Sequence, residues 1–227
     1  MKLTVSKNPE AMKDSGGGGG YINRSGIYDV TLNFVQVAKT KNGAFSLNFN
    51  ITHQGMDQTI YGPVLLNIDG NVNTITQGLL NRLCVIAGMN DGQEIETESA
   101  EYPVGKDQKL MEMDVIPELA DLSVKMRIQM EYNVYREEIK ENKSIKAFYR
   151  EDGATAAEAE SNENIGKRLA LDEEKYASNV TYKDGLTEQS VQEWIASRVA
   201  AASNGSGSKT PSPKAKTTAK RPLFGKE

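Results

Sequence analysis

The chain has 227 residues, with 27 Lys and Arg against 31 Asp and Glu, which gives a formal net charge of −4. Its single cysteine, Cys84, and single histidine, His53, exclude an intramolecular disulfide and leave too few ligands for a zinc site built from Cys and His. We recognise no signal peptide and no apolar run long enough to span a membrane, so we expect a cytoplasmic protein.

The first third of the chain predicts β-structure. The five glycines at 16–20 favour a flexible joint that follows a short N-terminal arm. Apolar and polar residues then alternate over residues 28–34 and 45–51, on either side of Asn42-Gly43, which predicts a β-hairpin. A third extended stretch, residues 59–68, is interrupted by Gly62-Pro63, which indicates a bulge or an edge strand.

The period then changes from two to 3.6. Ile75, Leu79, Leu83 and Ile86 form an apolar helical stripe, and Thr74 with Gln77 resembles a capping box at its start. We expect an acidic loop over residues 91–102 and a short strand over residues 109–116. The clearest strand covers residues 122–134, and a turn at residues 141–143 leads to a return strand at 144–150.

This order of elements predicts a mainly β fold. Three strands, a helix and then two or three strands match a five-stranded Greek-key barrel of the OB type, which carries its helix between the third and fourth strands. We therefore divide the chain into an N-terminal arm and glycine joint (1–20), an OB-like barrel (21–152), a helical extension (153–202) and a disordered basic tail (203–227).

Cations and aromatic rings on the predicted sheet suit single-stranded nucleic acid, which binds in a cationic groove with bases stacked on exposed rings. If the apolar residues of strand 122–134 face inward, Lys125 and Arg127 face outward together. On the return strand Lys146, Phe148 and Arg150 share one face. The candidate DNA-binding residues are Arg24, Lys39, Lys41, Tyr61, Lys125, Arg127, Lys146, Phe148 and Arg150.

Each of these assignments has a structural alternative. Lys125 and Arg127 are equally suited to solvating a sheet face. A bulge in the last strand would shift its register and turn Phe148 into the core. Tyr61 is as well suited to packing as to stacking.

Residues suited to catalysis are sparse, so we expect a protein that is not an enzyme and that needs no metal and no cofactor. There is no G-x-x-x-x-G-K-[ST] phosphate loop, and one histidine offers little for a nucleophile–base pair. The carboxylates between Glu94 and Glu101 are typical of a solvated loop. A metal-dependent nuclease would have to use this stretch as its site.

The C-terminal tail has a charge opposite to that of the remaining chain. Residues 203–227 contain six cations and one anion, so the net charge of −4 divides into +5 for the tail and −9 for the first 202 residues. The tail could attract DNA phosphates, bind the acidic surface of its own or a neighbouring copy, or act only as a solubilising end. Leu223 and Phe224 offer a short hydrophobic contact, and Trp194 lies on an amphipathic helix that either packs on the barrel or binds a partner protein.

Three stretches carry a resemblance to a known family. SGIYDVTLNFVQVAKTKNGAFSLNFNI, AFYREDGATAAE and KYASNVTYKDGLTEQ resemble bacteriophage single-stranded DNA-binding proteins of the OB-fold type. The resemblance implies binding to single-stranded DNA with little sequence preference, in DNA replication and recombination. Many such proteins end in an acidic tail with a terminal Phe, whereas this chain ends in a basic PLFGKE.

A second interpretation is a phage protein-interaction module. In that case the Trp194 helix and the tail bind a host or replisome protein. The sequence leaves the oligomeric state open, a homodimer included.

Overall fold

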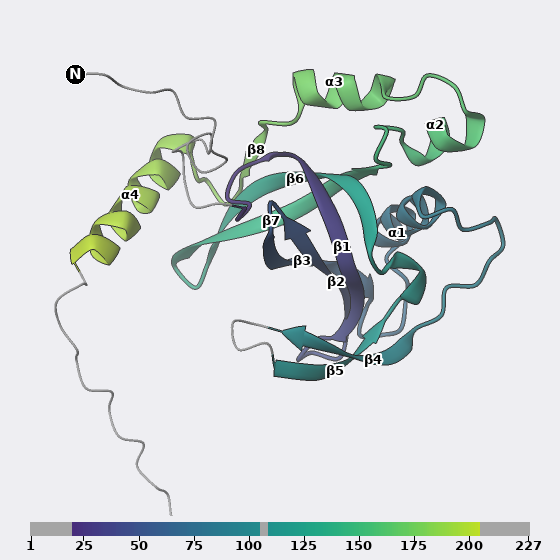
Figure 1. Cartoon of the computed structure of the whole chain (residues 1–227). Coiled ribbons are helices and arrows are strands. Elements are labelled where there is room, and N and C mark those ends of the chain that lie inside the picture. The colour runs from purple at the N-terminus through teal and green to yellow at the C-terminus, as the bar shows by residue number, and fades with distance from the viewer. Residues whose placement is uncertain (1–19, 105–108, 205–227) are drawn as a thin grey trace, which may run out of the picture. The chain divides into compact units, whose positions relative to one another are not determined.

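The computed structural model describes residues 20–104 and 109–204 (Figure 1). The predicted N-terminal arm, most of the glycine joint and residues 205–227 of the basic tail, which include Leu223 and Phe224, lie outside these ranges. The contacts of the chain divide it into two compact units, residues 1–186 and 187–227.

The first unit is mainly β, as predicted, and its strands join in one sheet. The strands are β1 (Gly26–Lys39), β2 (Phe45–His53), β3 (Met56–Leu66), β4 (Glu98–Val104), β5 (Lys109–Val115), β6 (Leu122–Tyr135), β7 (Glu138–Tyr149) and β8 (Val180–Tyr182). The helices of this unit are α1 (Thr74–Ile86), α2 (Ala156–Ser161) and α3 (Lys167–Lys175), with a 3₁₀ turn η1 (Pro117–Leu119).

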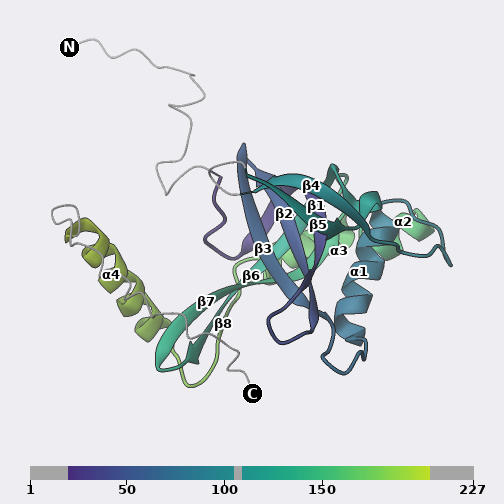
Figure 2. The ribbon, with the colours of Figure 1, turned by 90° about the horizontal axis from the view of Figure 1, so that it is seen from below.

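Five strands form an antiparallel path in the order β3-β2-β1-β6-β7 (Figures 1 and 2). The 14-residue β1 is long enough to pair with β6 through Gly26–Leu32, with β2 through Thr31–Lys39 and with β5 at Gln36. The β4–β5 hairpin therefore joins the sheet at β1, and β8 adds a parallel strand to β6.

The two ends of this path, β3 and β7, lie against each other without a hydrogen-bonded ladder, so the sheet is not closed within the described part of the chain. Helix α1 contacts both β3 and β7. Helix α1 and the two end strands therefore meet at this gap.

The core follows the predicted alternation. Every second residue of β6 from Val124 to Tyr132 is buried. Leu47, Phe49 and Ile51 of β2 belong to the main apolar cluster of the core. Helix α1 adds Leu79, Leu80, Leu83 and Ile86 to this cluster.

The start of α1 differs from its prediction in two ways. Ile75, expected in the apolar stripe, is 82% exposed. The N-cap is Asn73, whose side-chain oxygen accepts the N–H groups of Ile75 and Thr76. Ile75 is thus a first-turn residue whose side chain is exposed, whereas the later turns of the helix contribute to the core.

One hairpin turn was predicted correctly from the sequence, and another was not. Asn42-Gly43 forms the predicted β1–β2 turn, with Gly43 at a φ of 92°. The β6–β7 turn falls at Arg136-Glu137, with φ of 51° and 66°, and not at residues 141–143, which belong to β7. Two non-glycine residues in the left-handed region leave no turn signal in the composition, so the prediction was wrong there.

The segment after β7, which the sequence assigns to a helical extension from residue 153, groups by its contacts with the sheet in one compact unit that runs to residue 186. The Oδ2 of buried Asp172 in α3 accepts a hydrogen bond from the Tyr149 hydroxyl at 2.5 Å. The same oxygen lies 3.7 Å from the Arg127 Nε of β6. Burial, and then this hydrogen bond, raise the pKa of Tyr149. A carboxylate shared by β6 and β7 fastens α3 to the sheet.

Helix α4 (Glu188–Asn204) lies in the second unit. None of the helices in residues 20–104 and 109–204 is both long and apolar enough to cross a membrane.

Candidate nucleic-acid interface

A groove of about 400 Å³ lies between β3, α1 and β7, at the gap where the sheet path ends. We call it the β3–β7 groove. The residues that line it are Tyr61, Gly62, Pro63, Ile75, Thr76, Leu79, Arg82, Glu131, Asn142, Lys143, Ser144, Ile145 and Lys146.

Tyr61 presents its ring at this groove and is 76% exposed. The predicted irregularity at Gly62-Pro63 is present, because the β2–β3 register shifts between Ser46 and Asn48. A Cβ on Gly62 would lie 2.1 Å from the carbonyl oxygen of Leu47, so only glycine allows this approach of the two strands. The alternative in which Tyr61 packs into the core is therefore wrong, and its ring is available for stacking.

Three cations line the groove. Arg82 comes from α1, and Lys143 and Lys146 come from β7. Arg82 and Lys143 form no ion pair within the described residues, and the Lys143 Nζ lies 3.9 Å from the ring centroid of Tyr21.

One carboxylate, Glu131, faces these cations. Its Oε1 lies 2.7 Å from the Lys146 Nζ, and its Oε2 lies 2.6 Å from the Lys183 Nζ. Burial alone would raise the pKa of Glu131, but the hydrogen bonds from Lys146 and Lys183 outweigh it and lower the pKa to about 2. At neutral pH the groove thus holds three cations against one charged carboxylate, which leaves it suited to an anionic ligand.

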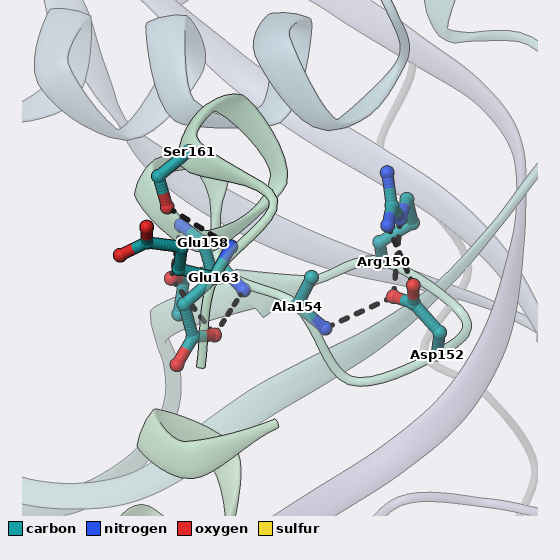
Figure 3. Close-up of polar contacts among 7 residues, drawn as sticks. Arg150, Asp152, Ala154, Glu158, Ser161 and Glu163 are labelled. Carbon is teal, nitrogen blue, oxygen red and sulfur yellow. Dashed lines mark hydrogen bonds and ion pairs between the residues drawn. The ribbon is translucent and has the colours of Figure 1, made fainter. Parts of the chain in front are cut away.

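Three of the predicted cations lie elsewhere, and each faces a carboxylate. The Lys125 Nζ lies 2.5 Å from the Asp29 Oδ1, and the Arg127 guanidinium faces the carboxylate of buried Asp172. Arg150 pairs with Asp152 at 2.6 Å, which Figure 3 shows together with the Ala154 N–H that Asp152 also accepts. The hydrogen bond from Arg150 lowers the pKa of Asp152 to about 2. These pairs neutralise the cationic face that the alternation predicts.

The predicted outward position of Phe148 is wrong. Phe148 is 4% exposed, and its ring centroid lies 5.5 Å from that of Phe49. Arg127 pairs with Ala147 and Ile128 pairs with Ile145, so Lys146 is an extra residue in β7. This bulge changes the phase of the strand and allows Phe148 and Tyr149 to be buried together, as the bulge alternative predicted.

The remaining predicted residues do not line the groove. Lys39 and Lys41 lie at the β1–β2 turn, where the Lys39 Nζ is 5.8 Å from the Phe45 ring centroid. Arg24 is exposed, and its carbonyl oxygen accepts the Tyr28 hydroxyl. In α4, the Arg198 guanidinium lies 4.7 Å from the ring of partly buried Trp194.

Sequence reasoning missed Arg82 and Lys143. Arg82 occupies the polar side of the predicted helix, beside Leu83 of the apolar stripe, and is indistinguishable there from a solvated residue. Lys143 was placed in a turn, but the turn of the structure lies earlier in the chain, at Arg136-Glu137. Neither residue carries a local signal for a site, because the groove exists only where α1 meets the ends of the sheet.

No protein-family model matches the chain, and no curated protein matches it.

Proposed function

We propose that the chain binds single-stranded DNA without sequence preference through the β3–β7 groove. The observation that carries this proposal is the exposed Tyr61 ring beside three cations. An unpaired base stacks on Tyr61, while Arg82 and Lys143 contact the flanking phosphates. The class of ligand is the one that the sequence predicts, but most of the residues that contact it are different.

Stacking and charge together favour a single strand over a duplex. A base can lie on the Tyr61 ring only when it has left its own stack, and such stacking contributes about 1–3 kcal/mol per base. Asn142 and Ser144 also line the groove, where the Asn142 Nδ2 donates to the Asn133 Oδ1 and Ser144 hydrogen-bonds to Glu131. Sequence preference is not expected from these groups.

The strand order supports an OB-type barrel as part of this proposal. The path β3-β2-β1-β6-β7, with α1 between β3 and β6 in the chain, has the order of such a barrel, with the β4–β5 hairpin as an insertion and α4 as a helical extension. We place the protein in the cytoplasm, among bacteriophage proteins that bind strands exposed during replication and recombination, without catalysis.

Fluorescence anisotropy with labelled oligo-dT and the matching duplex tests the proposal at low and moderate salt. We expect wild type to prefer the single strand. Tyr61→Ala should weaken binding about tenfold, since one stacked base is worth about 1–3 kcal/mol. Tyr135→Ala, at the exposed β6–β7 turn, is the matched control and should bind like wild type.

The charge part of the site is tested with Arg82→Gln and Lys143→Gln. Both should weaken binding and reduce the salt dependence, whereas Lys175→Gln on the exposed end of α3 should do neither. Absence of oligo-dT binding by wild type at low salt would overturn the DNA proposal. The protein-interaction hypothesis, with Trp194 of α4 as its contact, would then be tested next.

A further inference from the structure

The residues that lead into β1, Gly20–Ser25, form an anchored segment that we call the N-terminal strap. Gln58 of β3 holds one end of it. The Gln58 amide nitrogen donates to the Gly20 carbonyl at 2.9 Å, and its amide oxygen accepts the Ile22 N–H at 3.1 Å. Gln58 is 8% exposed, so a buried amide uses both of its functions on the strap.

The other end of the strap is held by β6. The Ser25 hydroxyl oxygen accepts the backbone N–H of Met130 at 2.9 Å. Ile22, between these anchors, is buried in the core. A Cβ on Gly20, whose φ is 78°, would lie 2.5 Å from the His53 carbonyl oxygen, so glycine is required at the entry of the strap. The strap is therefore held by β3 at its start and by β6 at its end.

Tyr21 stands between the two residues that Gln58 holds. Ile22 is buried, whereas its neighbour Tyr21 faces outward. Its ring is 53% exposed, and the Lys143 Nζ lies 3.9 Å from the ring centroid. Because Lys143 also lines the β3–β7 groove, the strap places a second exposed aromatic ring beside a cation of that groove.

We propose that Tyr21 is a second stacking position for the strand bound at Tyr61, and that Gln58 is its positioning residue. This inference rests on the proposed function. The ligand at Tyr21 is an unpaired nucleobase, and Lys143, which contacts the Tyr21 ring and lines the groove with Tyr61, neutralises a phosphate of the same strand. The cation on one face of Tyr21 leaves the other face for a base, and it gains a full negative partner when DNA is bound.

Oligo-dT anisotropy with single and double variants tests the stacking position. Tyr21→Ala should lower affinity about fivefold or more, whereas Tyr21→Phe, which keeps the ring, should bind like wild type. Since Tyr21 is exposed, its removal leaves the fold intact. Wild-type affinity of Tyr21→Ala, measured beside a weakened Tyr61→Ala, would overturn the inference and leave the proposed function standing.

The positioning role of Gln58 is tested by a double-mutant cycle. Gln58→Leu should weaken binding in the wild-type background and should have little further effect in Tyr21→Ala, because both changes remove one stacking position. Additive effects would mean that Gln58 acts through general stability and would overturn its positioning role. Absence of oligo-dT binding by wild type would overturn the inference together with the proposed function.

The strap itself is observable without DNA. Nuclear Overhauser effects between the Tyr21 ring and the Lys143 side chain should be present in wild type and absent in Gln58→Leu. If Gln58→Leu does not fold, Gly20→Ala crowds the same end of the strap against the His53 carbonyl oxygen and should abolish the same signals. Persistence of these signals in a folded Gln58→Leu would overturn the positioning role.

Discussion

At the scale of single residues, a cation on a strand is informative only when its partner is known. Lys125, Arg127 and Arg150 have the spacing of a binding face, yet each lies beside a carboxylate. Arg82 and Lys143, with no such spacing, line the groove. A sheet-face cation therefore gives little information about a polyanion site until the carboxylates around it are placed.

A substitution of Phe148 distinguishes the predicted stacking role from the core position that the structure shows. Phe148→Ala should lower the free energy of unfolding by about 3–5 kcal/mol, because it leaves a cavity beside Phe49. Urea unfolding measures the change, with exposed Tyr61→Ala as the control that should alter stability by no more than about 0.5 kcal/mol. A stable Phe148→Ala protein with reduced oligo-dT affinity would contradict this placement.

Glu131 predicts a specific dependence of stability on pH. Its folded pKa of about 2 lies below the value of about 4.3 expected in the unfolded chain. Its ion pairs therefore stabilise the fold above about pH 4.3, and this contribution is lost as pH falls toward about 2. The difference in unfolding free energy between wild type and Glu131→Gln should be largest near neutral pH and should shrink toward pH 2.

The control for this measurement is Glu173→Gln, on the exposed side of α3. Its difference from wild type should be small at every pH. A wild-type advantage over Glu131→Gln that grows on acidification would show that the Lys146 and Lys183 pairs do not hold the carboxylate in its charged form.

At the scale of elements, irregularities in the strands place the site. One extra residue in β7 buries Phe148, and the close approach of β3 to β2 at Gly62 exposes Tyr61. The strap adds Tyr21 through an amide from β3. The first two features interrupt a regular ladder, and the strap adds a residue from outside the ladder.

Two glycine substitutions should have opposite effects. Gly62→Ala forces a Cβ against Leu47 and should destabilise by about 1–3 kcal/mol and displace Tyr61, with weaker oligo-dT binding. Gly78→Ala, in α1 with open space at its Cβ, should stabilise by about 0.5–1 kcal/mol and leave binding unchanged. Thermal and urea unfolding of both variants provide the measurement, and equal effects of the two substitutions would contradict the crowding at Gly62.

At the scale of the whole molecule, charge is divided unevenly along the chain. The six cations of residues 205–227 accompany a chain that is otherwise acidic. In a long-range field the acidic part repels a polyanion, so a cationic segment raises the local attraction and adds interactions with phosphates.

A chain that ends at Asn204 should therefore bind oligo-dT with a shallower dependence on salt. The logarithmic slope should fall by about 0.7 for each phosphate that the tail neutralises in the full-length protein. A full-length chain with the six tail cations replaced by Gln is the matched control and should show the same shallower slope. Anisotropy over a salt series measures both, and unchanged slopes would mean that the tail neutralises no phosphate.

Features that repeat over short distances could be predicted from the amino-acid sequence alone. The period-two patterns of β1, β2 and β6, the helical stripe of α1 and the Asn42-Gly43 turn are local, because backbone geometry alone converts them into elements. The mainly β class and the order of strands around α1 follow from these elements.

Which side chains line the candidate site depends on tertiary contacts. A single extra residue reverses the phase of a strand, so the pattern around Lys146 could not place Phe148. Ion pairs join residues as far apart in the chain as Asp29 and Lys125, 96 positions, and no local pattern contains them. The candidate site depends on such long-range neighbours, because Tyr21, Tyr61, Arg82 and Lys143 come together only where the strap, α1 and the two ends of the sheet meet.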